Sequence, residues 1–180
     1  MIKINMGCGW RNFGKGWTHI DSGNYEHLDA ESITDLNQYG TSTVDIIYAS
    51  HVIEYFDREE LPAVLREWRR ILKVGGILRV AVPNFKKIVD LYSSGEYTLN
   101  SFLGPLYGKM FMRTSPIYHK TIYDLVSLSE VLKDSGFRDL KQWDWRETEH
   151  ARYDDHSQAY LPHMDKENGT LISLNMECKK

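Results

Sequence analysis

Two glycines and one acidic residue near the start of the chain have the types and spacing of a nucleoside-binding site. Gly7 and Gly9 follow the short apolar run 3–6, and Asp21 comes fourteen residues after Gly7. Glycines at such a turn let the backbone approach a ligand closely. An acid at the end of the following strand can hold both hydroxyls of a ribose. The structural alternative is an ordinary turn with a capping aspartate.

The stretch between this turn and the next strand is too short for a full helix. Only residues 10–16 separate Gly9 from Trp17, and at about 1.5 Å per residue they cannot span a sheet face as a helix. A dinucleotide needs such a helix, because its pyrophosphate binds at the helix N-terminus. The spacing therefore favours a ligand with a ribose but no phosphate, such as S-adenosylmethionine (SAM). Trp10, Phe13, Trp17 or a partner chain would cover the sheet face left bare.

Three further residues are candidates for acid–base chemistry. His51 and Glu54 follow the apolar run 44–50 and share a face if that stretch is helical. His119 lies in a polar stretch, and a histidine suits base catalysis near neutral pH. The alternatives are a histidine bonded to the backbone, a capping glutamate and a surface histidine. No metal site is expected, and residues 150–163, with their several histidines and acids, are interpreted as a solvated loop.

Strands and helices that could position these residues are visible in the sequence. Residues 3–6, 17–21, 44–50 and 77–82 are expected strands, and a short one is expected at 33–36. Residues 57–73 show helical spacing of apolar side chains, with Asp57 as cap. Strand, helix and strand over 44–82 predict a right-handed βαβ unit.

The second half of the chain shows weaker patterns. After a short helix from Asn84, the stretch to residue 123 is rich in glycine and aromatic residues, so we expect a lid or insertion at about 85–125, with most of its aromatic side chains buried. A helix is expected at 127–136, capped by Ser127. Residues 138–145 and 170–178 predict an antiparallel edge pair. The whole predicts one α/β domain, residues 1–180. Its sheet is Rossmann-like, doubly wound and mostly parallel, with an antiparallel edge strand and a reduced first helix.

The first half of the chain resembles a known family. The segments "INMGCG", "VDIIYASHVIEYF" and "LREWRRILKVGGILRVAVPN", with Asp21 between the first two, are similar to the class I SAM-dependent methyltransferases. The resemblance covers residues 2–84 in order. The chain departs from the usual pattern at Asn5, where an acid is usual, at the reduced first helix, and at Val74, where proline is usual.

The resemblance implies a cofactor, SAM, and a set of residues that hold it. Asp21 would hold the ribose, and Asp35 with Leu36 would contact the adenine. The implied contacts with the methionine part and the methyl group are Met6, Gly7, Cys8, Gly9, Ala49, Ser50 and His51. His51, Glu54 and His119 are the catalytic candidates for methyl transfer to an oxygen.

Composition limits the partners. With 42% apolar and 26% charged residues, a net charge of −3 and two cysteines far apart, the 180-residue chain is expected to be cytoplasmic, without a leader or membrane span, and not to bind nucleic acid. A small-molecule or carbohydrate-like acceptor is expected, and a second copy of the chain stays a candidate partner. Two alternatives are a SAM-binding regulatory protein without catalysis and an NAD or nucleotide-sugar enzyme.

Overall fold

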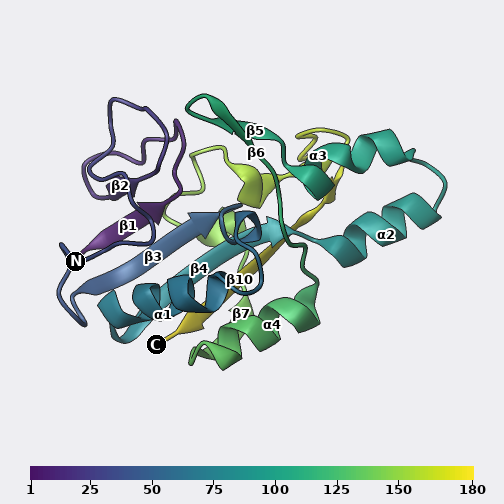
Figure 1. Cartoon of the computed structure of the whole chain (residues 1–180). Helices are drawn as coiled ribbons and strands as arrows, with labels where there is room; N and C mark the ends of the chain where they lie inside the picture. Colours follow the sequence, from purple (N-terminus) through teal and green to yellow (C-terminus); the bar gives the residue numbers. More distant parts are fainter.

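A six-stranded sheet forms the centre of the protein, described here from a computed structural model of residues 1–180 (Figure 1). Its strands lie in the order β2-β1-β3-β4-β10-β7. The bounds are β1 Lys3–Met6, β2 Thr18–Ile20, β3 Val44–Ser50, β4 Leu72–Pro83, β7 Arg138–Gln142 and β10 Ser173–Lys179. β10 runs antiparallel to both neighbours, and the remaining pairs are parallel. This mostly parallel sheet confirms the predicted fold class, with the antiparallel strand one place in from the edge.

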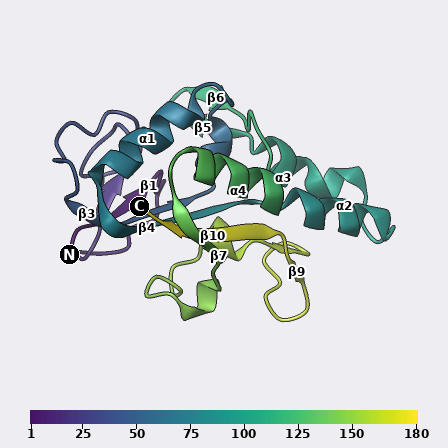
Figure 2. The same cartoon turned by 90° about the horizontal axis from the view of Figure 1, so that it is seen from below.

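Two helices, α1 (Leu61–Ile71) and α4 (Leu125–Asp134), lie on one side of the sheet (Figure 2). Before α1, the Asp57 carboxylate accepts the backbone N–H of Glu60 at 2.9 Å, and proline in the first turn loses no hydrogen bond. The helix α4 begins two residues before the predicted cap, because Asp124 is the N-cap and Ser127 closes the capping box from the third helical position.

The main hydrophobic core lies between these helices and the sheet. The residues that α1 buries have the predicted helical spacing; they are Leu61, Val64, Leu65, Trp68 and Ile71. They pack on apolar side chains of β1, β3 and β4. The strand β4 starts directly after α1, so β3, α1 and β4 form the predicted βαβ unit. None of the helices combines the length and apolar character needed to cross a bilayer.

Loops rather than helices cover the opposite face of the sheet, where Figure 2 shows the yellow-green segment of residues 143–169. Phe13 and Trp17 from the shortened first connection pack there on Tyr48 of β3. His150 stacks on Phe13, with ring centroids 5.5 Å apart. The aromatic residues thus replace the absent helix, as predicted for Phe13 and Trp17. The prediction is wrong for Trp10, which is 67% exposed.

The buried imidazole of His150 is expected to make the protein acid-sensitive. It is 1% exposed, and burial lowers its pKa to about 3. Below about pH 6.5 this histidine is protonated in the unfolded chain but stays neutral in the folded chain. The free energy of unfolding is therefore highest above that pH and decreases as the pH falls towards 3. We expect His150→Phe to remove up to about 4 kcal/mol of this acid-induced loss, measured by urea unfolding between these pH values. His163→Phe, at an exposed loop position, is the control, and an equal effect in both variants would contradict the prediction.

The segment predicted as a lid continues from β4 away from the sheet (Figure 1). Its elements are α2 Phe85–Ser93, a 3₁₀ turn Leu99–Phe102, α3 Leu103–Tyr107, β5 Met110–Met112 and β6 Ser115–Ile117. A small second core holds it against the short pair β8 (Tyr160–Leu161) and β9 (Thr170–Leu171) through Ile88, Phe102, Leu161 and Ile172. The expectation that most of its aromatics are buried is wrong, because Tyr92, Tyr107, Phe111 and Tyr118 are exposed.

Candidate cofactor and catalytic site

The glycine turn lies beside the carboxyl ends of β1, β2 and β3. The Gly7 amide donates to the Ile20 carbonyl at 2.7 Å, and both glycines have a positive φ. A side chain on Gly7 would overlap Val52, whereas a Cβ on Gly9 would meet nothing within 4 Å. Gly7 is therefore required by packing, and Gly9 leaves open space of the kind that a ligand needs.

Asp21 organises this turn. Its carboxylate accepts the backbone N–H of Gly9 at 2.8 Å and that of Gly23 at 2.6 Å, and the residue is 5% exposed. Each carboxylate oxygen can accept a second hydrogen bond, so the same group can receive ribose hydroxyls while it holds the turn. The sequence pointed to the ribose role but not to the two backbone contacts.

The other predicted cofactor residues differ in accessibility. Met6 is fully buried, Ala49 is 1% exposed and Cys8 is 4% exposed. Burial raises the pKa of the Cys8 thiol to about 12, so it stays protonated. Ser50 and His51 are partly exposed at the end of β3.

The predicted adenine pair, Asp35 and Leu36, lies differently from the expectation. No strand forms at 33–36, and Leu36 is fully buried in the main core, so its side chain offers no surface to a ligand in this structure. Asp35 is exposed and accepts the amide of Asn37 at 3.3 Å. The residue that extends the sheet beyond β2 is Ala30, through a single parallel bridge to Ile20.

Folding brings the three catalytic candidates together. Glu54, in the 3₁₀ turn Ile53–Tyr55, is fully buried. One of its carboxyl oxygens, Oε1, lies 3.3 Å from Nδ1 of His51 and 3.8 Å from Nε2 of His119. The backbone carbonyl of Glu54 accepts the amide of Lys120 at 2.8 Å, which holds the segment of His119 against the turn.

Burial sets the charge of this cluster. Removal from water lowers the pKa of His51 well below its usual value and lowers the pKa of His119. It raises the pKa of the Glu54 carboxyl to about 8. Both imidazoles are therefore neutral at neutral pH, the form in which a histidine can accept a proton.

His51 has a strained backbone. Its φ is 54°, in the left-handed region that non-glycine residues rarely adopt. Its amide donates to the Ala81 carbonyl of β4 at 2.8 Å, which fixes this conformation at the end of β3. Strain of this kind is retained where the surrounding structure over-determines it, commonly at functional sites.

A fourth histidine, His156, stands next to His51, with ring centroids 5.2 Å apart. The sequence carried no signal for it, because the loop that bears it was interpreted as solvated. That interpretation is wrong for His150 and Asp155, which are 1% and 3% exposed. The Tyr48 hydroxyl donates to Asp155 at 2.5 Å across the sheet face. No group of three or more His, Cys, Asp or Glu side chains is placed to hold a metal ion.

Gly108 fixes the position of His119. Its φ is 51°, and an added Cβ would overlap the His119 ring. We expect Gly108→Ala to displace this imidazole and to lower the free energy of unfolding by about 1–3 kcal/mol. Gly104→Ala is the control, because a Cβ there meets nothing within 4 Å. Histidine NMR spectra and urea unfolding check both effects, and identical behaviour of the two variants would count against the assignment.

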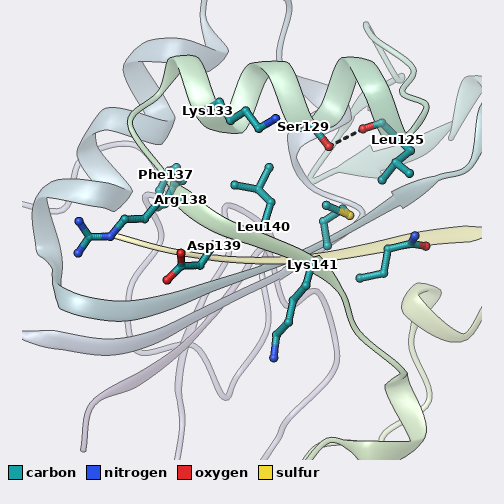
Figure 3. Close-up of a pocket in the computed structure, with 10 residues that line it drawn as sticks. Leu125, Ser129, Lys133, Phe137, Arg138, Asp139, Leu140 and Lys141 are labelled. Atoms are coloured by element: carbon teal, nitrogen blue, oxygen red, sulfur yellow. Dashed lines mark hydrogen bonds between the residues drawn. The ribbon is translucent and has the colours of Figure 1, made fainter.

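Two of the hollows on the surface bear on the site. The groove in Figure 3 runs between α4 and β7, which forms the edge of the sheet opposite to β1 and β2. It contains none of the predicted site residues. The second is lined by His119 and its neighbours Leu106, Tyr107, Lys120, Thr121 and Ile122. It borders the cluster through His119.

Comparisons with known proteins match part of the sequence and the whole fold. Residues 15–80 match the family model described as a methyltransferase domain. A SAM-dependent methyltransferase of Thermotoga maritima, described as a possible histamine N-methyltransferase, has 14% identity and a TM-score of 0.62 over 99% of this chain and 82% of its own. A SAM-dependent methyltransferase of Archaeoglobus fulgidus has 16% identity and a TM-score of 0.59, over 99% and 85%.

A third structure contains bound ligands. It is the 1,6-didemethyltoxoflavin-N1-methyltransferase of Burkholderia thailandensis with 1,6-didemethyltoxoflavin and S-adenosylhomocysteine, at 11% identity and a TM-score of 0.58, over 99% of this chain and 70% of its own. No curated protein matches the chain. At these identities the structures show the shared fold.

The mostly parallel sheet, with the glycine turn at the carboxyl ends of its strands, defines a Rossmann-like fold. Residues 15–80 carry the sequence match to a methyltransferase domain, and the whole chain shares its fold with SAM-dependent methyltransferases.

Proposed function

We propose that the protein transfers the methyl group of SAM to an oxygen of a small hydroxylated or carbohydrate-like molecule. The observation that carries this proposal is the cluster of His51, Glu54 and His119 beside the hollow at Tyr107. A hydroxyl must lose its proton during methylation, and neutral imidazoles at the site suit that requirement. An amine acceptor depends less on a base than a hydroxyl does, because a neutral amine can attack the methyl group before it loses a proton.

The residues of the glycine turn fit the cofactor. Gly9 leaves open space, and the buried Asp21 carboxylate can accept hydroxyl groups. No helix begins at the turn, so no N–H groups gather there for a phosphate, and SAM carries none. When bound, SAM supplies a methyl group already activated on a sulfonium. Asp21 would then hold the ribose, and Ser50 and His51 would border the reacting end.

His51 is the proposed base. Its Nε2 lies 3.4 Å from the Ser173 hydroxyl, a long contact that an acceptor could displace. The two ring nitrogens of His119 face the Pro105 carbonyl and Glu54, so this residue is better placed to line the acceptor space. Because the methyl carbon is already reactive, the chief task of the chain is to bring the acceptor oxygen into line with it.

Two measurements test the proposal. Calorimetry is expected to show SAM binding and no NAD binding, and absence of SAM binding at millimolar concentration would overturn the proposed cofactor site. Label from methyl-labelled SAM is then followed on a panel of sugars, phenols and amines. Transfer to hydroxyl compounds is expected. Transfer only to amines would contradict the oxygen assignment, and binding without any transfer would favour a regulatory SAM-binding protein.

A further inference from the structure

The carboxyl group of Glu54 is buried without a hydrogen-bond donor. Residue Glu54 is fully buried, and neither of its carboxyl oxygens receives a hydrogen bond. An ionised carboxylate in such a place is costly unless it is paired. The proton positions of its two neighbouring imidazoles therefore decide which group carries a proton.

A chain of hydrogen bonds that starts at the backbone determines which ring nitrogen of His51 carries the proton. The amide nitrogen of Asn175 donates to the Ser157 carbonyl at 2.9 Å, so the amide oxygen of Asn175 faces Ser173. This oxygen can only accept, and the Ser173 hydroxyl donates to it at 2.8 Å. The Ser173 oxygen is then free to accept from Nε2 of His51, 3.4 Å away. A neutral His51 with its proton on Nε2 has a bare Nδ1, and Nδ1 faces Oε1 of Glu54.

His119 also presents an unprotonated ring nitrogen to Glu54. Its Nδ1 lies 3.1 Å from the Pro105 carbonyl, which can only accept, so Nδ1 carries the proton. In a neutral ring Nε2 is then bare, and it faces the same oxygen of Glu54 at 3.8 Å. Two acceptors thus converge on one carboxyl oxygen, and a proton on that oxygen removes the conflict.

We propose that Glu54 is protonated in the resting protein and is a positioning residue whose ionisation switches His51 between its two neutral tautomers. At rest, the Glu54 hydroxyl faces the bare Nδ1 of His51, and Nε2 of His51 carries its proton. When the pair loses one proton to solvent, Glu54 becomes a carboxylate, the ring proton moves to Nδ1, and Nε2 is left with a free lone pair. That second state is the one in which His51 can accept a proton from a hydroxyl, so this part rests on the proposed function.

The titratable groups around Glu54 are consistent with this switch. Burial raises the pKa of Glu54 to about 8, within reach of ordinary buffers. The other titratable groups that face the pair are His119 and Tyr123 from the lid segment, Tyr55 of the same turn, and His156 beside His51. The positive charge of Arg11 also acts on His51 and His156 and disfavours a second proton on either ring. Burial, with a contribution from Glu54, raises the pKa of Tyr55 well above its usual value and that of Tyr123 to about 12, and removal of the His156 ring from water lowers its pKa. In the range where Glu54 titrates, these tyrosines and histidines keep their neutral forms.

The test is the ¹⁵N spectrum of the His51 ring in the full chain between about pH 6 and about pH 10. The wild type is expected to change from the Nε2-protonated to the Nδ1-protonated tautomer near pH 8. Glu54→Gln should stay in the Nε2-protonated form throughout, because an amide N–H continues to face Nδ1. A doubly protonated His51 at pH 6, or one Nδ1-protonated over the whole range, would overturn the proposal.

A second measurement covers the outcome that Glu54→Gln does not fold. The infrared carbonyl band of a protonated carboxyl should be present in the wild type at pH 6 and disappear near pH 8, whereas an ionised Glu54 at pH 6 contradicts the proposal. In His119→Gln the band should persist, since His51 still faces the proton. Calorimetric SAM binding at pH 7 reports separately on the proposed function, so the two can fail independently.

Discussion

Replacing Asp21 by alanine is expected to weaken SAM binding by about 100-fold or more, which corresponds to roughly 2.7 kcal/mol. The variant loses the proposed ribose acceptor and also the two charge-assisted contacts to the amides of Gly9 and Gly23, which shape the turn. Both amides lose their acceptor, that of Gly23 in a buried position and that of Gly9 in a partly buried one. Calorimetry with SAM, accompanied by urea unfolding, measures the two consequences separately.

Two further substitutions sharpen this result. Asp21→Asn keeps the shape but turns an N–H donor towards one of the two amides, so we expect weaker binding than wild type and partial retention compared with alanine. Asp35→Ala removes an exposed acid that only the family resemblance connects with the cofactor. Unchanged affinity in Asp21→Ala would exclude the ribose role. A large loss of SAM affinity in Asp35→Ala would indicate that Asp35, rather than Asp21, is the acid that holds the ribose.

Trp68→Ala is expected to cause the largest loss of stability, about 3–5 kcal/mol. The Trp68 side chain is fully buried between α1 and the sheet, and its Nε1 donates to the Ile33 carbonyl at 2.8 Å. Alanine would leave a large cavity and an unpaired carbonyl together. Since a domain of this size is stable by only about 5–15 kcal/mol, the variant should be close to unfolding at physiological temperature.

Trp68→Phe separates the two contributions. It keeps most of the buried ring volume but loses the hydrogen bond, so we expect a loss of about 1–2 kcal/mol. Urea unfolding with a constant slope measures both variants. Equal losses in the two variants would show that cavity formation contributes little. A loss below 1 kcal/mol in Trp68→Ala would contradict the core position of this side chain.

Trp68 also connects the core to the candidate site. The Ile33 carbonyl that it binds belongs to the connection between Ala30, next to β2, and Leu36 in the core. The Arg70 guanidinium of α1 donates to the carbonyls of Leu36 and Tyr39 in the same connection. The helix α1 therefore holds this connection in place, although the connection itself pairs with the sheet only through the single bridge at Ala30.

Local patterns were sufficient for the parts of the fold that depend on neighbours in sequence. The apolar spacing in 57–73 predicted α1, and the βαβ unit followed from the order of β3, α1 and β4. Local patterns do not report contacts that depend on a distant segment. The family resemblance implied that Leu36 contacts the adenine, whereas its side chain fills the core beneath α1 in this structure. Burial of that kind depends on which surfaces meet, and periodicity cannot report it.

The sequence by itself pointed to the class of ligand. Only seven residues separate Gly9 from Trp17, too few for a helix that spans the sheet face and presents its N-terminus to a phosphate, and Asp21 follows at the end of β2. Only the tertiary structure decided which groups meet at the catalytic candidate site. Glu54 lies between His51 and His119, which are 68 residues apart in the chain, and the loop of His156 closes on His51 from the other side. Such contacts arise from packing between distant segments, which local sequence spacing does not encode.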